Sequence, residues 1–275
     1  MDTESILRRA DALFDAGRAE DAVRFMEESL TEAEAEGDWQ TRLALLNEVM
    51  GYYRSTGRLE RAGSLAEQAL DILAAHELEQ TLAGATTRLN VATLRRAEGQ
   101  PGEALSLYRQ VELVYRQQGL SRDIRLGGLY NNMAVASLET GRREDAVSFS
   151  RAALQALPDS GEAAGERASV LTTLAAALLQ GGPSGEDEAE ACLDQALSLY
   201  ENEAAGDPHQ GAALAARGAL HYRRGRLDQA LACYEQAWEL NRRVFGENRD
   251  SATLERTVQA LRRLTGREPG KENHD

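Results

Sequence analysis

The sequence contains little of what a β-sheet needs. Among its 275 residues are only 3 Ile and 10 Val, against 45 Ala and 38 Leu, and aromatic residues make up 5% of the chain. Strands favour β-branched and aromatic side chains, whereas Ala and Leu are among the best helix formers. The composition therefore disfavours an all-β fold and a doubly wound α/β fold, and it predicts an all-α protein.

Signals for secretion, membrane insertion and disulfide bonding are also missing. Two cysteines do not make a disulfide framework, and no stretch approaches 18 uninterrupted apolar residues. The first nine residues, Met-Asp-Thr-Glu-Ser-Ile-Leu-Arg-Arg, lack the apolar core of a signal peptide. We therefore expect a cytoplasmic protein that has no membrane partner.

Positive charge is scarce relative to negative charge, and the formal net charge is −14. Nucleic-acid backbones and anionic membrane surfaces bind cationic patches, so neither is an expected partner. The last quarter of the chain is locally rich in arginine, with Arg223, Arg224, Arg226, Arg242 and Arg243. These arginines are either a solvated surface or a site for acidic peptides.

Residues with catalytic or metal-binding potential do not form a recognisable pattern. No glycine-rich loop has phosphate-binding spacing, and no two histidines are four residues apart. His221, Cys192 and Cys233 fall in helix positions of a buried type, so we interpret them as packing residues. We therefore predict no enzyme activity, no metal site and no cofactor.

One sequence motif recurs along the chain: a glycine, three or four further residues, and then an alanine. It is GRAEDA at Gly17, GRLERA at Gly57, GQPGEA at Gly99, GRREDA at Gly141 and GRLDQA at Gly225, with a looser copy from Gly181. The closing alanines are 40 to 43 residues apart. A second set of glycines divides each period into two segments of about 20 residues, and the five prolines lie in these breaks or in the tail.

Small residues recur at fixed places in each period, which indicates close helix packing. The key alanines are Ala22, Ala62, Ala104, Ala146, Ala189 and Ala230. Small side chains at such positions let a neighbouring helix approach closely. A single pair of amphipathic helices cannot bury its apolar stripe, but stacked pairs can, so the pattern predicts a right-handed α-α superhelix with a concave face.

These recurring positions, called columns below, resemble the pattern of the tetratricopeptide repeat (TPR) family. The period of about 42 residues, together with Leu89-Asn90-Val91-Ala92, Tyr130-Asn131-Asn132-Met133-Ala134 and the run from Phe245 to Leu254, resembles its kinesin-light-chain-like subclass. The resemblance implies one TPR solenoid over residues 1–265. It has six helix hairpins, with units 3–37, 38–79, 80–121, 122–161, 162–206 and 207–246.

The chain after the sixth unit reads as an end cap. We predict a capping helix over 251–265, whose apolar stripe is Leu254, Val258, Leu261 and Leu264. Residues 266–275 are predicted to be a disordered tail.

The resemblance also implies where a ligand lies, because ligands of this family usually contact the first helices of the hairpins. Those helices carry the candidate peptide-binding residues Asn47, Arg54, Asn90, Arg96, Asn131, Asn132 and Tyr222. An asparagine amide can donate to and accept from an extended peptide backbone, and paired arginines can bind a carboxylate. The alternative is that the asparagines hydrogen-bond between helices and the arginines are simply solvated.

Two functions remain open at this point. The first is a non-catalytic scaffold that binds a protein or peptide partner in the concave groove. The second is a peptide-responsive regulator whose solenoid changes pitch when a signalling peptide binds. For either function we expect a monomer or a weak homo-oligomer.

Overall fold

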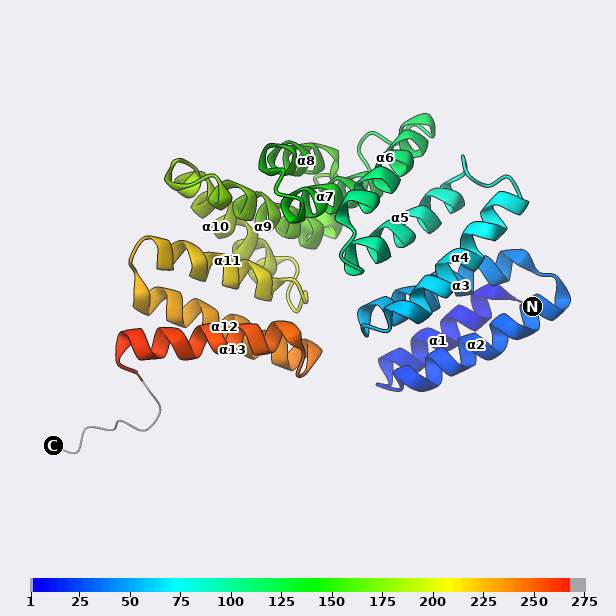
Figure 1. Cartoon of the computed structure of the whole chain (residues 1–275), viewed down its shortest axis with the longest axis horizontal. Helices are drawn as coiled ribbons and strands as arrows, with labels where there is room; N and C mark the ends of the chain where they lie inside the picture. Colours follow the sequence, from blue (N-terminus) through cyan, green and yellow to red (C-terminus); the bar gives the residue numbers. More distant parts are fainter. Residues whose placement is uncertain (1, 268–275) are drawn as a thin grey trace. The chain divides into compact units, whose positions relative to one another are not determined.

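The computed structural model describes residues 2–267, and between these limits it is all-α with no strand, as the composition predicts. The chain divides into two compact units, Met1–Leu120 (unit 1) and Ser121–Asp275 (unit 2). Each unit is built from antiparallel helix hairpins (Figure 1). The all-α repeat fold with six hairpins and a terminal helix is therefore confirmed over the described residues.

Unit 1 contains three hairpins, and their helices are α1 (Thr3–Asp15) with α2 (Ala19–Glu36), α3 (Trp39–Ser55) with α4 (Leu59–Ala75), and α5 (Leu82–Ala97) with α6 (Pro101–Gln117). Unit 2 contains the other three and the end helix: α7 (Ile124–Glu139) with α8 (Arg143–Ala156), α9 (Ala164–Gln180) with α10 (Glu186–Asn202), α11 (Gln210–Arg223) with α12 (Leu227–Phe245), and α13 (Arg249–Thr265). Two short 3-10 turns, Gly161–Ala163 and Pro183–Gly185, precede α9 and α10.

The recurring glycine makes the turn inside each hairpin. Gly57 and Gly141 have φ angles of 73° and 72°, in the left-handed region that residues with a Cβ avoid. In the looser fifth copy, Gly182 rather than Gly181 takes the positive φ, at 90°. The shift by one residue accommodates the longer connection before α10.

Polar residues cap the first helices of several hairpins. Asp38 accepts a hydrogen bond from the Thr41 amide at 3.1 Å, and Thr81 accepts one from the Gly84 amide at 3.1 Å. A side-chain oxygen at this position satisfies an amide that the helix leaves unpaired, which is worth about 1 kcal/mol. These caps fix where α3 and α5 begin, and hence which residues face the neighbouring helix.

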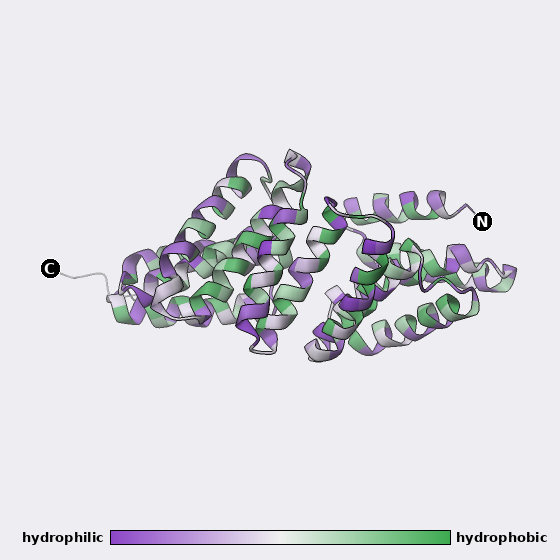
Figure 2. Cartoon of the chain, turned by 90° about the horizontal axis from the view of Figure 1, so that it is seen from above, coloured by the Kyte–Doolittle hydropathy of each residue, from purple (hydrophilic) through white to green (hydrophobic). Residues whose placement is uncertain are grey.

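The key alanines lie where helices touch. All six are fully buried, with exposed fractions of 0%: Ala22, Ala62, Ala104, Ala146, Ala189 and Ala230. Larger side chains such as Tyr53, Met50 and Leu73 fill the space beside them in unit 1. Figure 2 shows the helices hydrophobic on one side and hydrophilic on the other, as expected for stacked amphipathic hairpins.

Helix α13 covers the last hairpin of unit 2, and Figure 1 shows it beside α12 at the red end of the chain. Asn248 and Ser251 form a reciprocal capping box at its start. Val258 and Leu261 are buried as predicted, but the assignment of Leu264 to the apolar stripe is wrong, because this side chain is 61% exposed. No further hairpin among the described residues packs on this side of α13.

Two sequence-based expectations are not tested by the structure. The two units are described separately, so the single solenoid over 1–265 stays a prediction. The predicted disordered tail, 266–275, lies outside the described residues from position 268 onward. Among residues 2–267, no helix is long and apolar enough to cross a lipid bilayer.

Candidate functional site

Asn47 is the centre of a hydrogen-bond network between the first helices of two neighbouring hairpins in unit 1. Its Nδ2 donates to Thr87 Oγ1 on α5 and to the Leu43 carbonyl, both at 3.0 Å. Its Oδ1 accepts from Asn90 Nδ2 at 2.9 Å. The two asparagines therefore do hydrogen-bond between helices, and their contact with a peptide stays a prediction.

Two arginines lie further along the same helices, Arg54 on α3 and Arg96 on α5. Arg54 is seven residues, or about 10 Å, beyond Asn47. Burial and the positive charge of Arg96 lower the pKa of Arg54 below its usual value. No carboxylate within residues 2–267 forms an ion pair with Arg54. Unit 1 therefore holds a half-buried guanidinium near a second one, and their binding of a carboxylate stays a prediction.

Tyr108 of α6 lies near both arginines, and its side chain is fully buried. Its hydroxyl lies 3.2 Å from Thr93 Oγ1, and it also contacts Arg96. Burial raises the pKa of Tyr108, so the phenol stays neutral and does not offset the charge of the two arginines.

A mainly apolar cavity of about 420 Å³ lies at the opposite end of α3 and α5, and Asn47 and Thr87 are part of its wall. Its apolar lining includes Trp39, Leu43 and Leu78. The surface from this cavity through Asn47 and Asn90 to Arg54 and Arg96 is called here the α3–α5 groove. Along it lie the apolar cavity, the two hydrogen-bonded asparagines and the two arginines, in that order.

Comparison with known proteins identifies this architecture. Residues 211–251, which cover all but the first residue of α11, the whole of α12 and the start of α13, match the family model described as "Tetratricopeptide repeat". The chain has the tetratricopeptide-repeat fold. The TPR resemblance drawn from the sequence is thereby confirmed, and the solved structures below bear out its kinesin-light-chain-like subclass at the level of the fold. No curated protein matches the chain.

Solved TPR structures share the fold at low sequence identity. The putative kinesin light chain TPR-like repeats of Podosopora anserina are 20% identical, with a TM-score of 0.57 over 75% of this chain and 98% of that one. BtubC (BKLC) of P. vanneervenii is 18% identical, with a TM-score of 0.62 over 90% and 94%. A STAND protein with a TPR sensor from Pyrococcus horikoshii is 16% identical, with a TM-score of 0.65 over 97% of this chain and 39% of that one.

The predicted site residues on the TPR hairpins of unit 2 fall in two separate places. Asn131 and Asn132 line a polar cavity between α7 and α9. Tyr222, which is 52% exposed, lines an apolar cavity of about 540 Å³ against α13, together with Tyr234 and Leu264. Unit 2 therefore does not gather its three candidates into one site.

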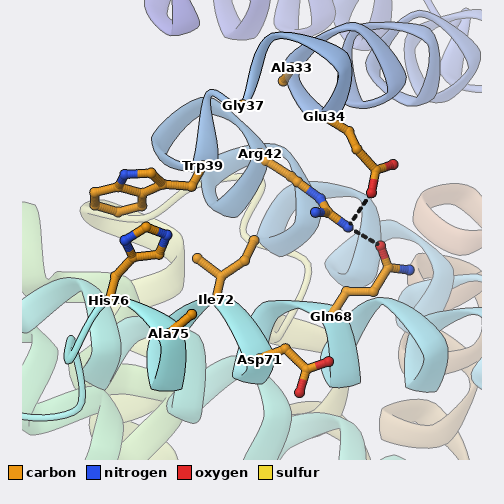
Figure 3. A pocket seen from close by; sticks show the side chains of 10 residues that line it. All are labelled: Ala33, Glu34, Gly37, Trp39, Arg42, Gln68, Asp71, Ile72, Ala75 and His76. Carbon is orange, nitrogen blue, oxygen red and sulfur yellow. Dashed lines mark hydrogen bonds and ion pairs between the residues drawn. The ribbon is translucent and has the colours of Figure 1, made fainter.

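A further cavity, which the sequence did not reveal, lies between α2, α3 and α4 and has a volume of about 370 Å³ (Figure 3). The indole of Trp39 stacks on the imidazole of His76, with ring centres 4.3 Å apart. Arg42 contacts Glu34 and Gln68, each at 3.0 Å. Trp39 occurs in only one of the repeats, so no column marks it. An aromatic residue in the first turn of α3 was the available signal.

The arginines of the last quarter mostly bind carboxylates of the preceding TPR hairpin. Arg224 contacts Asp187 and Glu190, each at 2.7 Å, and Arg223 contacts Glu186 at 3.2 Å. Ion pairs between hairpins therefore occupy these cations, in contrast to Arg54 in unit 1.

The cysteines and His221 of the described chain lie at separate packing positions. Cys192 is buried and Cys233 half-buried, and both are free thiols whose pKa burial raises. His221 is buried as predicted, but its Nδ1 has no hydrogen-bond partner within residues 2–267, so it is not a fully satisfied histidine. Over the same residues, no three His, Cys, Asp or Glu side chains are placed to hold a metal ion.

Proposed function

We propose that the protein is a non-catalytic scaffold that binds an extended segment of a partner polypeptide in the α3–α5 groove. The observation that carries the proposal is Arg54, which is half-buried next to Arg96 and has no carboxylate partner within residues 2–267. Removing a cation from water is costly unless an anion compensates it. A carboxylate of the partner supplies that anion.

The rest of the groove supplies the other contacts of an extended peptide. An apolar side chain of the ligand enters the cavity lined by Trp39, Leu43 and Leu78. The network uses both amide hydrogens of Asn47 but only one of Asn90. The ligand backbone therefore binds the rest of the Asn90 amide and the remaining acceptor site of Asn47, between this cavity and the arginines. In unit 2, Asn131, Asn132 and Tyr222 are further proposed contacts of the ligand. The proposed cellular location of the protein is the cytoplasm.

The geometry of α3 fixes the spacing that the ligand needs. Leu43 and Arg54 are eleven residues apart on α3, which is about 16 Å along the helix axis. An extended peptide advances about 3.3 Å per residue. The apolar residue and the acidic residue of the ligand should therefore be about five positions apart.

Fluorescence anisotropy with labelled peptides tests the proposal. The probes carry one Leu and one Glu separated by two, four or six Gly/Ser residues, and each has a counterpart with Gln in place of Glu. Four intervening residues should give the tightest binding. The Glu peptide should bind roughly 10- to 100-fold more tightly than its Gln counterpart, as expected for hydrogen bonds to a charged group.

Two variants test whether the preference for Glu over Gln arises in the α3–α5 groove. Arg54→Gln should abolish the preference for Glu over Gln while the Gln peptide binds as before. Arg24→Gln removes an exposed arginine of α2 and should change neither peptide. An unchanged Glu preference in Arg54→Gln would show that the groove does not bind the carboxylate.

A further inference from the structure

A second, chemically different cavity lies within unit 2. It has a volume of about 200 Å³ and lies between α7, α9 and the loop before α11. Side chains of Asn131, Glu166, Asp207 and His209 line it. Its volume is below the 300 Å³ at which pockets for drug-sized ligands begin, so it suits one side chain.

The charge of this cavity is negative and largely uncompensated. Glu166 is exposed and forms no ion pair within residues 2–267. Within residues 2–267, the hydrogen bonds to the Asp207 carboxylate come from His209, with Oδ1 2.9 Å from Nδ1 and 2.8 Å from the backbone amide. Arg167, adjacent in sequence to Glu166, is turned to Asp159 and to the Pro158 carbonyl.

Asp207 can approach α9 closely because Gly165 has no side chain. A Cβ at this position would lie 2.6 Å from Asp207 Oδ2, closer than such atoms approach. The second carboxylate oxygen therefore lies against α9 at Gly165, and Glu166 of the same helix also lines the cavity.

Gly128 opens the cavity from the α7 side. It lies inside a helix, where glycine costs roughly 1 kcal/mol relative to alanine. Its φ is not positive, and a Cβ there would meet no atom within 4 Å. Neither the backbone nor the packing requires this glycine, but its absent side chain leaves room in the cavity.

Asn131 adds an acceptor that the protein does not use. Its Oδ1 is fully buried and receives no hydrogen bond from residues 2–267, and its Nδ2 makes only a long 3.4 Å contact with Ser169 Oγ. An unpaired buried acceptor costs about 1–3 kcal/mol. Asn131 lines the cavity, so this side chain is within reach of a donor group bound there.

We propose that the cavity binds a basic side chain, the guanidinium of arginine or the ammonium of lysine, from the bound partner polypeptide. Two carboxylates and an amide oxygen accept hydrogen bonds from these donor-only groups. The assignment to a polypeptide rests on the proposed function, whereas the cavity lies within unit 2 and does not involve Arg54.

Amino-acid derivatives test the cavity without a partner peptide. N-acetyl-arginine amide and N-acetyl-lysine amide are titrated into the full chain, with the side-chain amides of ¹⁵N-labelled asparagines observed by NMR. At least one cation should shift the Asn131 and Asn132 signals saturably, and N-acetyl-glutamine amide should not. Absence of a saturable shift with both cations, or tighter binding of Ca²⁺ than of either, would overturn the proposal.

Two kinds of variant distinguish binding in the cavity from non-specific attraction of a cation to an acidic protein. Asp207→Asn and Glu166→Gln should each weaken binding by tenfold or more, and Gly128→Leu should abolish it by filling the space while the fold is retained. Glu201→Gln, an exposed acid of α10 outside the cavity, should bind like the wild type. Wild-type affinity of Gly128→Leu for the arginine and lysine derivatives would also overturn the proposal. This outcome is independent of the effect of Arg54→Gln on the binding of acidic peptides, which tests the proposed function.

Discussion

The side-chain amide of Asn90 donates to Asn47 Oδ1 at 2.9 Å, and Asn47 donates in turn to the hydroxyl of Thr87, which is fully buried. This chain of polar contacts joins α3 to α5 through side chains alone. Asparagine is a poor residue for a helix interior, so two of them facing each other cost helix propensity. The contact between hairpins offsets that cost.

Asn47→Ala should destabilise unit 1 by about 1–3 kcal/mol, because it leaves a buried hydroxyl without its donor. Asn90→Ala should cost less, since Asn90 is only half-buried and makes one of the three hydrogen bonds. Urea unfolding followed by circular dichroism measures both. Asn202→Ala, whose amide only contacts its own exposed helix, is the control and should stay within 0.5 kcal/mol. Equal midpoints for Asn47→Ala and the control would contradict the network's importance.

Arg54→Leu should raise the thermal midpoint of the protein and weaken its binding of acidic peptides. The substitution removes a half-buried cation that has another cation nearby and forms no ion pair within residues 2–267, and an apolar side chain is less costly there. Differential scanning calorimetry and the peptide titration measure the two effects on the same sample. If the midpoint falls, Arg54 stabilises the fold, and its role in ligand binding needs another basis.

Ala146→Glu should cost several kcal/mol, because it places a charge where α8 touches its neighbours. Gln155→Glu puts the same acid on the exposed side of α8 and is the matched control. Thermal unfolding distinguishes them. Wild-type stability of Ala146→Glu would mean that the alanine columns do not mark helix contacts.

His221 should make stability depend on pH. Burial and the cations Arg217 and Arg226 lower its pKa, and Glu190 opposes them only in part. The folded state therefore binds a proton less readily than the unfolded state. The contribution of His221 to the free energy of unfolding is fully present above the ordinary histidine pKa of about 6.5, and it is lost as pH falls below that value.

Thermal midpoints between pH 7.5 and 5 test this sign. His221→Leu should show a shallower fall toward pH 5 than the wild type. His76→Gln, at an exposed histidine, should keep the wild-type slope. A steeper fall in His221→Leu would reverse the assignment.

The sequence predicted the hairpins and their contacts because these depend on columns that recur in every period. Ala104 and Ala146 are fully buried for the same geometric reason, and any one repeat supports the register of the others. Hydrogen bonding of Asn47 and Asn90 between helices was one of the two alternatives that the sequence left open, because the two residues fall at neighbouring positions of adjacent first helices. Leu264 was assigned wrongly, since periodicity along α13 does not show whether another helix covers it.

The cavities were harder to find because they depend on residues that occur once. Trp39 and His76 meet only through the pairing of α3 with α4, and Asp207 lies in a loop outside the repeat columns. The open space beside Gly128 has no sequence signal other than a glycine inside a helix. Such features follow from three-dimensional packing and not from the period.

The capping side chains described for α3 and α5 bear on how such a protein can be rebuilt. Each of these hairpins carries its own start signal, Asp38 or Thr81, and its own turn at Gly57 or Gly99. The signals that start and turn a hairpin are therefore local. A gene segment encoding one hairpin carries its own helix boundaries when it is duplicated, whereas each new junction must still bury the apolar stripe that a hairpin leaves for its neighbour.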